Sequence, residues 1–470
     1  MAKAFHFNVG ARPISFSLIE QREVRRFLLS PFFNTRSDLL QLFDLYCAEP
    51  LAEKPQVWSA LFPEQTFDDQ KLRLLMSYLF KLLEQYLIIK TATSDPAQNL
   101  LHLAAGYRQR AMTHAFERTR TSLTQVLTSR PQRDAQYFER LYRLHWESYQ
   151  TAAAQNPSEA LPLRELAYAA DVHYFSTRLR LICLAAAQQG VYRADYHSSE
   201  DEAILVRAGQ EPWASVTAVA VYLHCWKMIQ HPEEEFHFQR FKEILLCRSE
   251  EFDHEEIRGL YLLAINYCIK RVNEGHKIFF GEVLDLYKSG LEGGRLFENG
   301  LLSRFTYHNI VAAGLQLKDY EWVAHFIHEY KSSLERAYRE SSFSFNLARL
   351  EYSRQNYPMV LQLLQGANYR DTLLNLAAKT LLMKTWYELG ETEVLFAHID
   401  AMRNYIRRKK VIGYHKTNYL NVLKYTDKLL KINRFDAAAV ALLKAEIEAE
   451  EILTERTWLI EQLQILTART

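Results

Sequence analysis

Residues 309–327 read NIVAAGLQLKDYEWVAHFI, residues 346–364 read NLARLEYSRQNYPMVLQLL, and residues 381–399 read LLMKTWYELGETEVLFAHI. The three segments superpose at offsets of 37 and 35 residues. In each segment apolar residues recur at spacings of three and four, as in an amphipathic helix, and a short polar turn interrupts the pattern. The sequence therefore predicts three consecutive hairpins, each made of a helix, a tight turn and a second helix.

The polar turns place one residue of each segment in register. Tyr320, Tyr357 and Thr392 stand at the ends of the turns Lys-Asp-Tyr, Gln-Asn-Tyr and Gly-Glu-Thr. We predict that these three residues occupy equivalent positions just after the inter-helix turns. A weaker copy of the pattern ends at residues 433–435, and another centres on residues 273–275.

A repeat of about 34–37 residues with this content resembles the tetratricopeptide repeat (TPR), and its best match is YELGE at residues 387–391. The resemblance covers residues 255–470 and implies a right-handed α-solenoid, in which each hairpin buries its apolar stripe against its neighbours. Val323, Val360 and Leu395 stand where the family prefers alanine. Because bulky side chains hold crossing helices apart, we expect a degenerate, TPR-like stack. The alternative is a helical bundle without a superhelix.

The composition favours an all-α fold. Only 15 Gly and 12 Pro occur in 470 residues, which is about half the usual share of these turn-forming residues. A β-sandwich, barrel or propeller needs many more tight turns, so these classes are excluded. Apolar residues make up 48% and charged residues 24%, which is ordinary for a folded protein and excludes collagen-like and disordered classes.

The N-terminal part is predicted to be a small helical domain. It resembles an uncharacterised bacterial family of helical proteins, in FLLSPFFN at residues 27–34 and DQKLRLLMS at residues 69–77. This resemblance implies helical architecture only. The predicted organisation is an N-terminal helical domain at 1–95, a long-helix region at 96–254, and TPR-like repeats at 255–470, closed by a capping helix from about Asp436 to Leu466.

Residues 57–90 also fit a winged helix-turn-helix. A short helix around Trp58, a longer helix with outward basic positions, and a β-branched run that would form a short hairpin at Leu87–Lys90 follow one another. In this interpretation the residues facing DNA are Lys71, Arg73, Ser77 and Lys81. However, residues 1–130 hold 16 Lys and Arg against 12 Asp and Glu, a net charge of only +4. DNA-reading domains normally concentrate more positive charge than this.

The sequence offers no signature of catalysis or of a cofactor. HExxH, GxSxG, Walker A and GxGxxG motifs are absent. His231 and His237 flank Glu233-Glu234-Glu235, but acidic residues after Pro232 are typical of a helix start. We therefore predict that the chain is not an enzyme and has no catalytic residues, metal or cofactor.

Charge and cysteine usage favour a cytoplasmic protein. The net charge is +1, and the five Cys are scattered without a CxxC pair, which suits a reducing compartment. The N-terminus lacks a signal-peptide layout. The longest uncharged apolar stretch, Pro212 to Trp226, is shorter than a membrane span of about 18–20 residues, so we predict no membrane partner.

Residues 403–434 form a basic segment with ten Lys and Arg and one acid, Asp427. Two interpretations remain open. Its cations pair with the acids that follow between Asp436 and Glu461, or they form a docking surface for an acidic partner or a nucleic-acid backbone. In the second case at least two of the four cations at 407–410 point to solvent. The candidate partner-binding residues are Arg403, Arg407, Arg408, Lys409, Lys410 and Lys416.

These features predict a non-enzymatic scaffold or adaptor, whose concave face holds a protein or peptide. The alternative function is a nucleic-acid-linked regulator with a winged-helix-like N-terminal domain and a repeat domain that binds a partner. A solenoid fold by itself implies no specific activity, and the sequence does not identify the partner or the oligomeric state.

Overall fold

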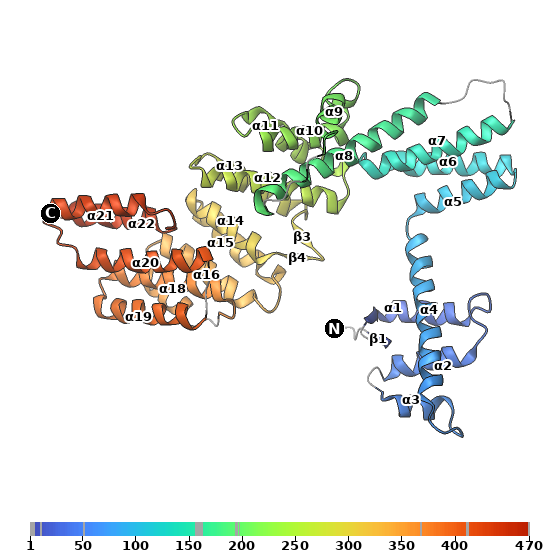
Figure 1. Ribbon diagram of the computed structural model, residues 1–470, viewed down its shortest axis with the longest axis horizontal. Coiled ribbons are helices and arrows are strands. Elements are labelled where there is room, and N and C mark those ends of the chain that lie inside the picture. Colours follow the sequence, from blue (N-terminus) through green and yellow to red (C-terminus); the bar gives the residue numbers. More distant parts are fainter. Residues whose placement is uncertain are drawn as a thin grey trace. The chain divides into compact units, whose positions relative to one another are not determined.

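The computed structural model describes residues 5–9, 12–49, 52–155, 163–192, 196, 198–366, 369–409 and 413–468. The chain is all-α, as predicted, with many helices packed in series (Figure 1). It divides into two compact units. Unit 1 comprises Met1–Leu184 and His197–Leu223, and unit 2 comprises Ala185–Tyr196 and His224–Thr470.

Unit 1 begins with an antiparallel β-hairpin and continues with helices. Its elements are β1 (Phe5–Val9), β2 (Arg12–Phe16), α1 (Leu18–Leu29), α2 (Ser37–Ala48), α3 (Lys54–Leu61), α4 (Asp69–Ala92), α5 (Pro96–Gln109), α6 (Thr113–Ser129), α7 (Ala135–Gln155), most of α8 (Leu163–Tyr192), α9 (Asp201–Ala208), the 3₁₀ helix η1 (Trp213–Ser215) and the start of α10 (Thr217–Gln230).

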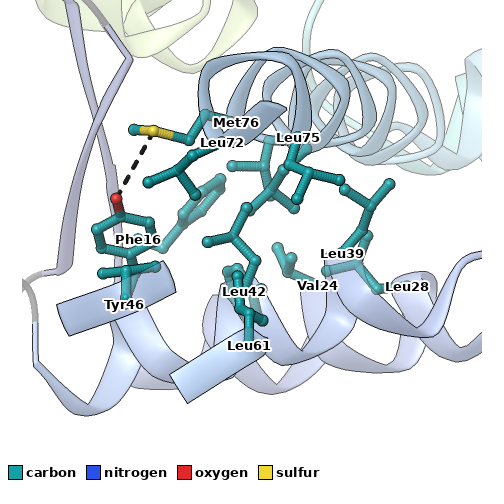
Figure 2. Close-up of a cluster of buried hydrophobic side chains, with 14 of the residues drawn as sticks. Phe16, Val24, Leu28, Leu39, Leu42, Tyr46, Leu61, Leu72, Leu75 and Met76 are labelled. Carbon is teal, nitrogen blue, oxygen red and sulfur yellow. Dashed lines mark hydrogen bonds between the residues drawn. The ribbon is translucent and has the colours of Figure 1, made fainter. Parts of the chain in front are cut away.

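Helices α1 to α4 enclose a hydrophobic core (Figure 2). On α4 the buried residues include Leu72, Leu75, Leu79 and Leu83, whose spacing of three and four residues is the stripe visible in the sequence. Burying one such side chain contributes about 1.5–3 kcal/mol. Phe16, at the end of β2, is 1% exposed in the same core, so the strand is part of this helical packing.

The predicted hairpin at Leu87–Lys90 is wrong. These residues belong to α4, which continues to Ala92, so the wing of a winged helix is absent from this position. Side-chain contacts hold this last part of α4 against α1. The Tyr86 hydroxyl donates to Glu23 at 2.7 Å, and Lys90 forms an ion pair with the same carboxylate. The hairpin of this unit instead pairs β1 with β2, with Phe5 opposite Phe16.

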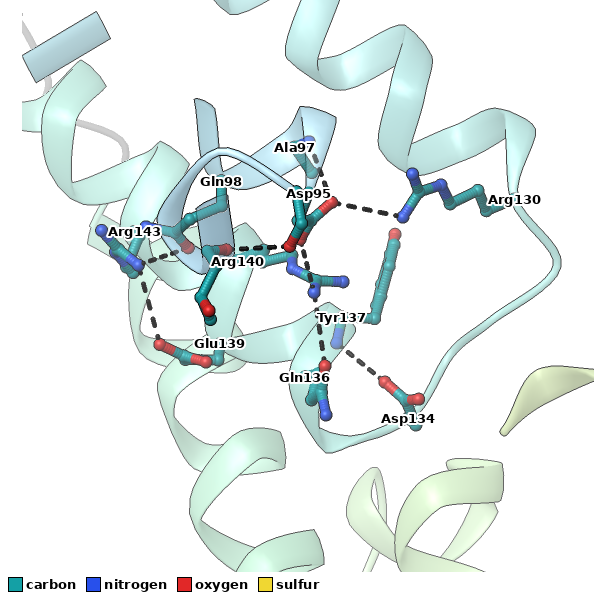
Figure 3. Close-up of polar contacts among 12 residues, drawn as sticks. Asp95, Ala97, Gln98, Arg130, Asp134, Gln136, Tyr137, Glu139, Arg140 and Arg143 are labelled. Atoms are coloured by element: carbon teal, nitrogen blue, oxygen red, sulfur yellow. Dashed lines mark hydrogen bonds and ion pairs between the residues drawn. The ribbon is translucent and has the colours of Figure 1, made fainter. Parts of the chain in front are cut away.

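Asp95 joins α5 to α7 (Figure 3). Its carboxylate caps α5 by accepting the Ala97 backbone N–H at 3.1 Å, and it pairs with Arg140 of α7 at 2.7 Å. Arg130 lies 3.6 Å from the same carboxylate. The polar break that precedes α5 is therefore a helix cap with two cationic partners.

Unit 2 contains the end of α8 and the rest of α10. Its further elements are α11 (Glu235–Cys247), η2 (Ser249–Glu251), α12 (His254–Asn273), α13 (Phe279–Glu292), β3 (Phe297–Glu298), β4 (Leu301–Leu302), α14 (Arg304–Gln316), α15 (Tyr320–Glu329), η3 (Tyr330–Ser333), α16 (Arg339–Ser353), α17 (Tyr357–Gln365), α18 (Thr372–Leu389), α19 (Thr392–Arg408), α20 (Gly413–Lys431), α21 (Ala437–Ala449) and α22 (Arg456–Ala468).

The helices of unit 2 pack in adjacent pairs, as in a helical-repeat solenoid. From α11 to α20 each helix packs on the next one in sequence. The first helices of successive hairpins also pack on one another, α14 on α16 and α16 on α18. This second set of contacts is typical of stacked hairpins.

The predicted register of the three hairpins is confirmed. Tyr320, Tyr357 and Thr392 are the first residues of α15, α17 and α19. Two residues before each of them stands a left-handed residue, with φ of +59° at Lys318, +61° at Gln355 and +73° at Gly390.

The same pair of backbone hydrogen bonds closes each of these turns. The N–H of the left-handed residue donates to the carbonyl three residues earlier, at 2.9–3.1 Å, and the next N–H donates to the carbonyl five residues earlier, at 2.9–3.1 Å. This is the Schellman motif, which satisfies carbonyls left free at a helix end. The turn between α5 and α6 has the same pair of bonds around Ala111, φ +54°.

The bulky residue at the first hairpin crossing is accommodated by a glycine. A Cβ on Gly314 of α14 would lie 2.4 Å from Cγ2 of Val323 on α15. The two helices therefore approach closely although Val323 is bulky, because the small residue of this contact is on the other helix.

The C-terminal end is formed by two helices, so the single capping helix expected from Asp436 to Leu466 is wrong. Two asparagines of α20 hold the break between α21 and α22. Asn421 donates to the Ile452 carbonyl at 3.0 Å, and the Asn418 side chain accepts the Thr454 N–H at 2.8 Å. The periodicity of apolar residues does not show side-chain bonds of this kind.

Replacing Gly390 by alanine should destabilise unit 2 by about 1 kcal/mol, because a Cβ in the left-handed region costs about 1–2 kcal/mol. The control is Gly281→Ala, since this glycine lies in α13 with open space around its Cα and alanine is the better helix former. Urea denaturation should show a lower midpoint for Gly390→Ala and an equal or higher midpoint for the control. Equal losses would contradict a conformational requirement at residue 390.

Candidate partner-binding surface

Three cations in the second half of the basic segment are paired with acids. Lys424 lies 3.7 Å from Glu450, Lys428 forms an ion pair with Glu446, and Lys431 pairs with Asp427 at 2.8 Å. Glu446 lies on α21, and Glu450 follows that helix directly. Lys424 and Lys428 therefore agree with the interpretation in which the basic segment pairs with the acids that follow it, whereas the partner of Lys431 lies within the segment.

The first half of the segment is different. Arg407 and Arg408 end α19, Lys409 is its C-cap, and Lys416 lies in the first turn of α20. We call these four residues the basic edge. All four are exposed, and none forms an ion pair with another residue in the described part of the chain.

The remaining two candidates differ from the basic edge. Arg403 pairs with Asp400 on the same helix at 3.1 Å. Lys410 lies outside the described residues. Three of the four cations at 407–410 are thus exposed. The docking interpretation requires at least two of them to point to solvent.

Unit 2 also contains a cavity of about 460 Å³ at the opposite ends of the same helices. Its lining combines apolar side chains with polar groups, and Glu388 and Arg434 are its charged residues. The lining comes from the end of α18, the start of α19, and the C-terminal halves of α20 and α22. The basic edge lies at the end of α19 and the start of α20, so the structure does not combine the cavity and the cations into one site.

Glu388 of α18 joins α22 to the stacked hairpins. Its Oε1 atom accepts hydrogen bonds from the Tyr352 hydroxyl at 3.1 Å, from Trp458 Nε1 at 3.1 Å and from Gln462 Nε2 at 2.8 Å. Lys384, one turn earlier, pairs with Glu455 at 2.8 Å. Because Trp458 and Gln462 lie on α22, this helix covers part of the face that the first helices α16 and α18 present.

A second buried polar cluster lies between α14 and α16. Asn346 donates to His308 Nδ1 at 2.7 Å, and Arg349 donates to the His308 backbone carbonyl at 3.1 Å. Burial lowers the pKa of His308 to about 4 and the pKa of Arg349 to about 10. At neutral pH the imidazole is therefore neutral and the guanidinium is charged. The sequence did not indicate this cluster, because its members are 38 and 41 residues apart.

In unit 1 the four residues of the DNA-binding interpretation lie on α4. Lys71, Arg73 and Lys81 are exposed, whereas Ser77 is half-buried. Arg73 forms an ion pair with Asp69, and the Lys71 ammonium lies 4.8 Å from the centre of the Phe62 ring. Two of these three cations thus have partners within unit 1.

No protein-family model, no curated protein and no solved structure matches this chain. None of the helices in the described ranges has the length and apolar character that crossing a bilayer requires.

Lowering the pH from 7 to 5 should destabilise the protein through His308. The unfolded imidazole, with a pKa near 6.5, takes up a proton in this range, and the folded imidazole, with a pKa of about 4, does not. Stability therefore falls as the pH falls, by an amount on the order of 1 kcal/mol for this group. Urea denaturation at both pH values should show a smaller loss for His308→Gln than for the wild type. Identical losses would contradict the lowered pKa.

Replacing Glu388 by alanine should cost about 2 kcal/mol or more, because it leaves three donors of low exposure without their acceptor. Glu393→Ala, at an exposed position in the first turn of α19, is the control. Hydrogen exchange should become faster in α22 of the Glu388 variant only. Unchanged exchange in α22 would show that this carboxylate does not hold the helix in place.

Purified protein should bind duplex DNA weakly and without sequence preference. The charge of residues 1–130 is small, and Arg73 is already paired, so few cations are free to release counterions from DNA. Fluorescence anisotropy at physiological salt should give dissociation constants of about 1 μM or weaker for unrelated duplexes. Tight binding to one sequence that Lys71→Ala with Arg73→Ala abolishes would instead support the regulator.

Proposed function

We propose that this chain is a non-enzymatic protein-binding scaffold, built on a TPR-like stack of helical hairpins, and that it binds an acidic segment of a partner protein at the basic edge. The observation that carries the proposal is the contrast within the basic segment. Lys424, Lys428 and Lys431 have acidic partners, whereas Arg407, Arg408 and Lys409 are exposed and form no ion pair with a described residue.

The position of these cations suits the recognition of a short acidic segment. They occupy consecutive positions in the last turn of α19, and consecutive positions on a helix point in different directions. An extended peptide that passes over the helix end thus meets several of them. Lys416 adds a fourth cation one turn into α20. Two arginines are also suited to the planar geometry of a carboxylate, which they bind through paired N–H groups.

The expected affinity is moderate. An exposed ion pair contributes about 0.2–1 kcal/mol, so three of them account for about a tenfold change in binding. Charge at such a surface mainly speeds association and selects between partners. The proposal therefore implies a transient complex whose strength depends on ionic strength.

The test uses full-length protein and a fluorescein-labelled peptide rich in Glu and Leu. Arg407→Ala with Arg408→Ala and Lys409→Ala should weaken binding about tenfold, with an unchanged melting curve. Wild-type binding should weaken as salt rises, because the Debye length falls from about 10 Å at 0.1 M to about 3 Å at 1 M.

The matched control removes three charges from the paired half of the segment. Lys424→Ala with Lys428→Ala and Lys431→Ala has the same net charge as the test variant, so a long-range effect of charge alone would weaken both equally. The proposal requires a larger effect at residues 407–409. A peptide dissociation constant that changes neither with salt concentration nor in the test variant would refute the proposal.

A further inference from the structure

Three histidines and two glutamates meet at the turn between α10 and α11. His224 lies on α10, His231 directly follows that helix, and His237 lies in the first turn of α11. His237 Nδ1 is 3.1 Å from His224 Nδ1, and His237 Nε2 is 3.3 Å from a carboxylate oxygen of Glu234. The His237 imidazole thus has a ring nitrogen of His224 on one side and a carboxylate on the other.

The other two residues complete the group. His231 Nδ1 lies 3.7 Å from a carboxylate oxygen of Glu233. One ligand atom from each of His231, Glu233 and Glu234 lies within 4.8 Å of the other two. All three side chains are exposed, so small rotations suffice to bring their ligand atoms closer.

The 3.3 Å between His237 Nε2 and the Glu234 carboxylate matches the separation of neighbouring ligands of a tetrahedral zinc ion, whereas the separations among His231, Glu233 and Glu234 are wider, up to 4.8 Å. Zinc binds imidazole nitrogen and carboxylate oxygen at about 2.0–2.2 Å, so neighbouring ligand atoms in a tetrahedron are about 3.3–3.5 Å apart. We propose that the turn binds a divalent transition-metal ion of the zinc type, with His231, Glu233, Glu234 and His237 as its ligands. Imidazole with carboxylate is a donor set that suits zinc.

His224 acts as a positioning residue. When His237 Nε2 binds the metal, the ring proton is on Nδ1 and donates to the lone pair of His224 Nδ1. Such a partner fixes the tautomer and the orientation of a ligating imidazole.

Glu234, the acid just before α11, does not cap this helix with its side chain. α11 begins at Glu235, as expected for acids after Pro232, but its N-cap Glu234 makes no side-chain capping hydrogen bond. The carboxylate of Glu234 instead faces His237. Of the nearby cations, Arg240 pairs with Glu243 at 2.7 Å.

The test begins with full-length protein stripped by a chelator. Calorimetric titration with ZnCl₂ should show one ion per chain at a dissociation constant of about 1 μM or tighter, and Co²⁺ should give the intense visible absorption of a tetrahedral site. His237→Gln should abolish this binding. His224→Gln should weaken it about 10–100-fold, as expected for a residue that orients a ligand.

Two further variants guard against misfolding and adventitious binding. Glu233→Gln changes an exposed ligand and should weaken binding in a protein with an unchanged circular dichroism spectrum. The control is His325→Gln, because His325 forms an exposed pair with Glu329 at 2.9 Å without a second histidine, and it should leave binding unchanged.

Three results would overturn the proposal. The first is the absence of stoichiometric Zn²⁺ binding by the wild type. The second is equal binding by the wild type and His237→Gln, which would show only scattered surface sites. The third is complete loss in His224→Gln with no effect of Glu233→Gln, because the metal would then lie between the two Nδ1 atoms and not within the proposed ligand set.

Discussion

The left-handed residue after the first helix of the hairpins α14–α15, α16–α17 and α18–α19 sets the geometry on which this part of unit 2 depends. It reverses the chain within three residues, so that the second helix packs back along the first. The two hydrogen bonds across the turn satisfy carbonyls that a helix end leaves free. A hairpin of this kind buries only part of its apolar surface by itself, and the rest is buried by the next hairpin. The order of α14 to α19 follows from three turns with the same backbone.

The spacing of apolar residues was sufficient to predict the three hairpins and their register. Any of Val, Leu or Ile can fill a buried helix position, so the spacing shows where the buried face lies even when the residue types differ. The sequence pattern gave a wrong prediction where contacts between distant residues determine the structure. Ile88 and Ile89 have high β-propensity, yet they extend α4, since the contacts of Tyr86 and Lys90 with Glu23 favour the helix. Propensity is a weak prior that such tertiary contacts override.

The candidate surfaces were predictable only in part. Composition shows that residues 403–434 are basic, but it does not show which cations have partners, because the partners are on elements later in the chain. Glu388 gave no signal beyond its place in a repeat motif, although it accepts hydrogen bonds from residues up to 74 positions away. The sequence likewise did not indicate a role for His224, because its contact with His237 depends on how α10 and α11 pack together.

The three turns also explain why the repeat is faint at the level of residue identity. Only one of the left-handed positions is glycine, and the others are Lys318 and Gln355. Each of these side chains retains a conformation that costs about 1–2 kcal/mol, and the packing of the flanking helices outweighs that cost. The three hairpins therefore share backbone angles at their turns more than they share residue identities. The left-handed position of such a turn can hold Gly, Lys or Gln while the backbone keeps the same path.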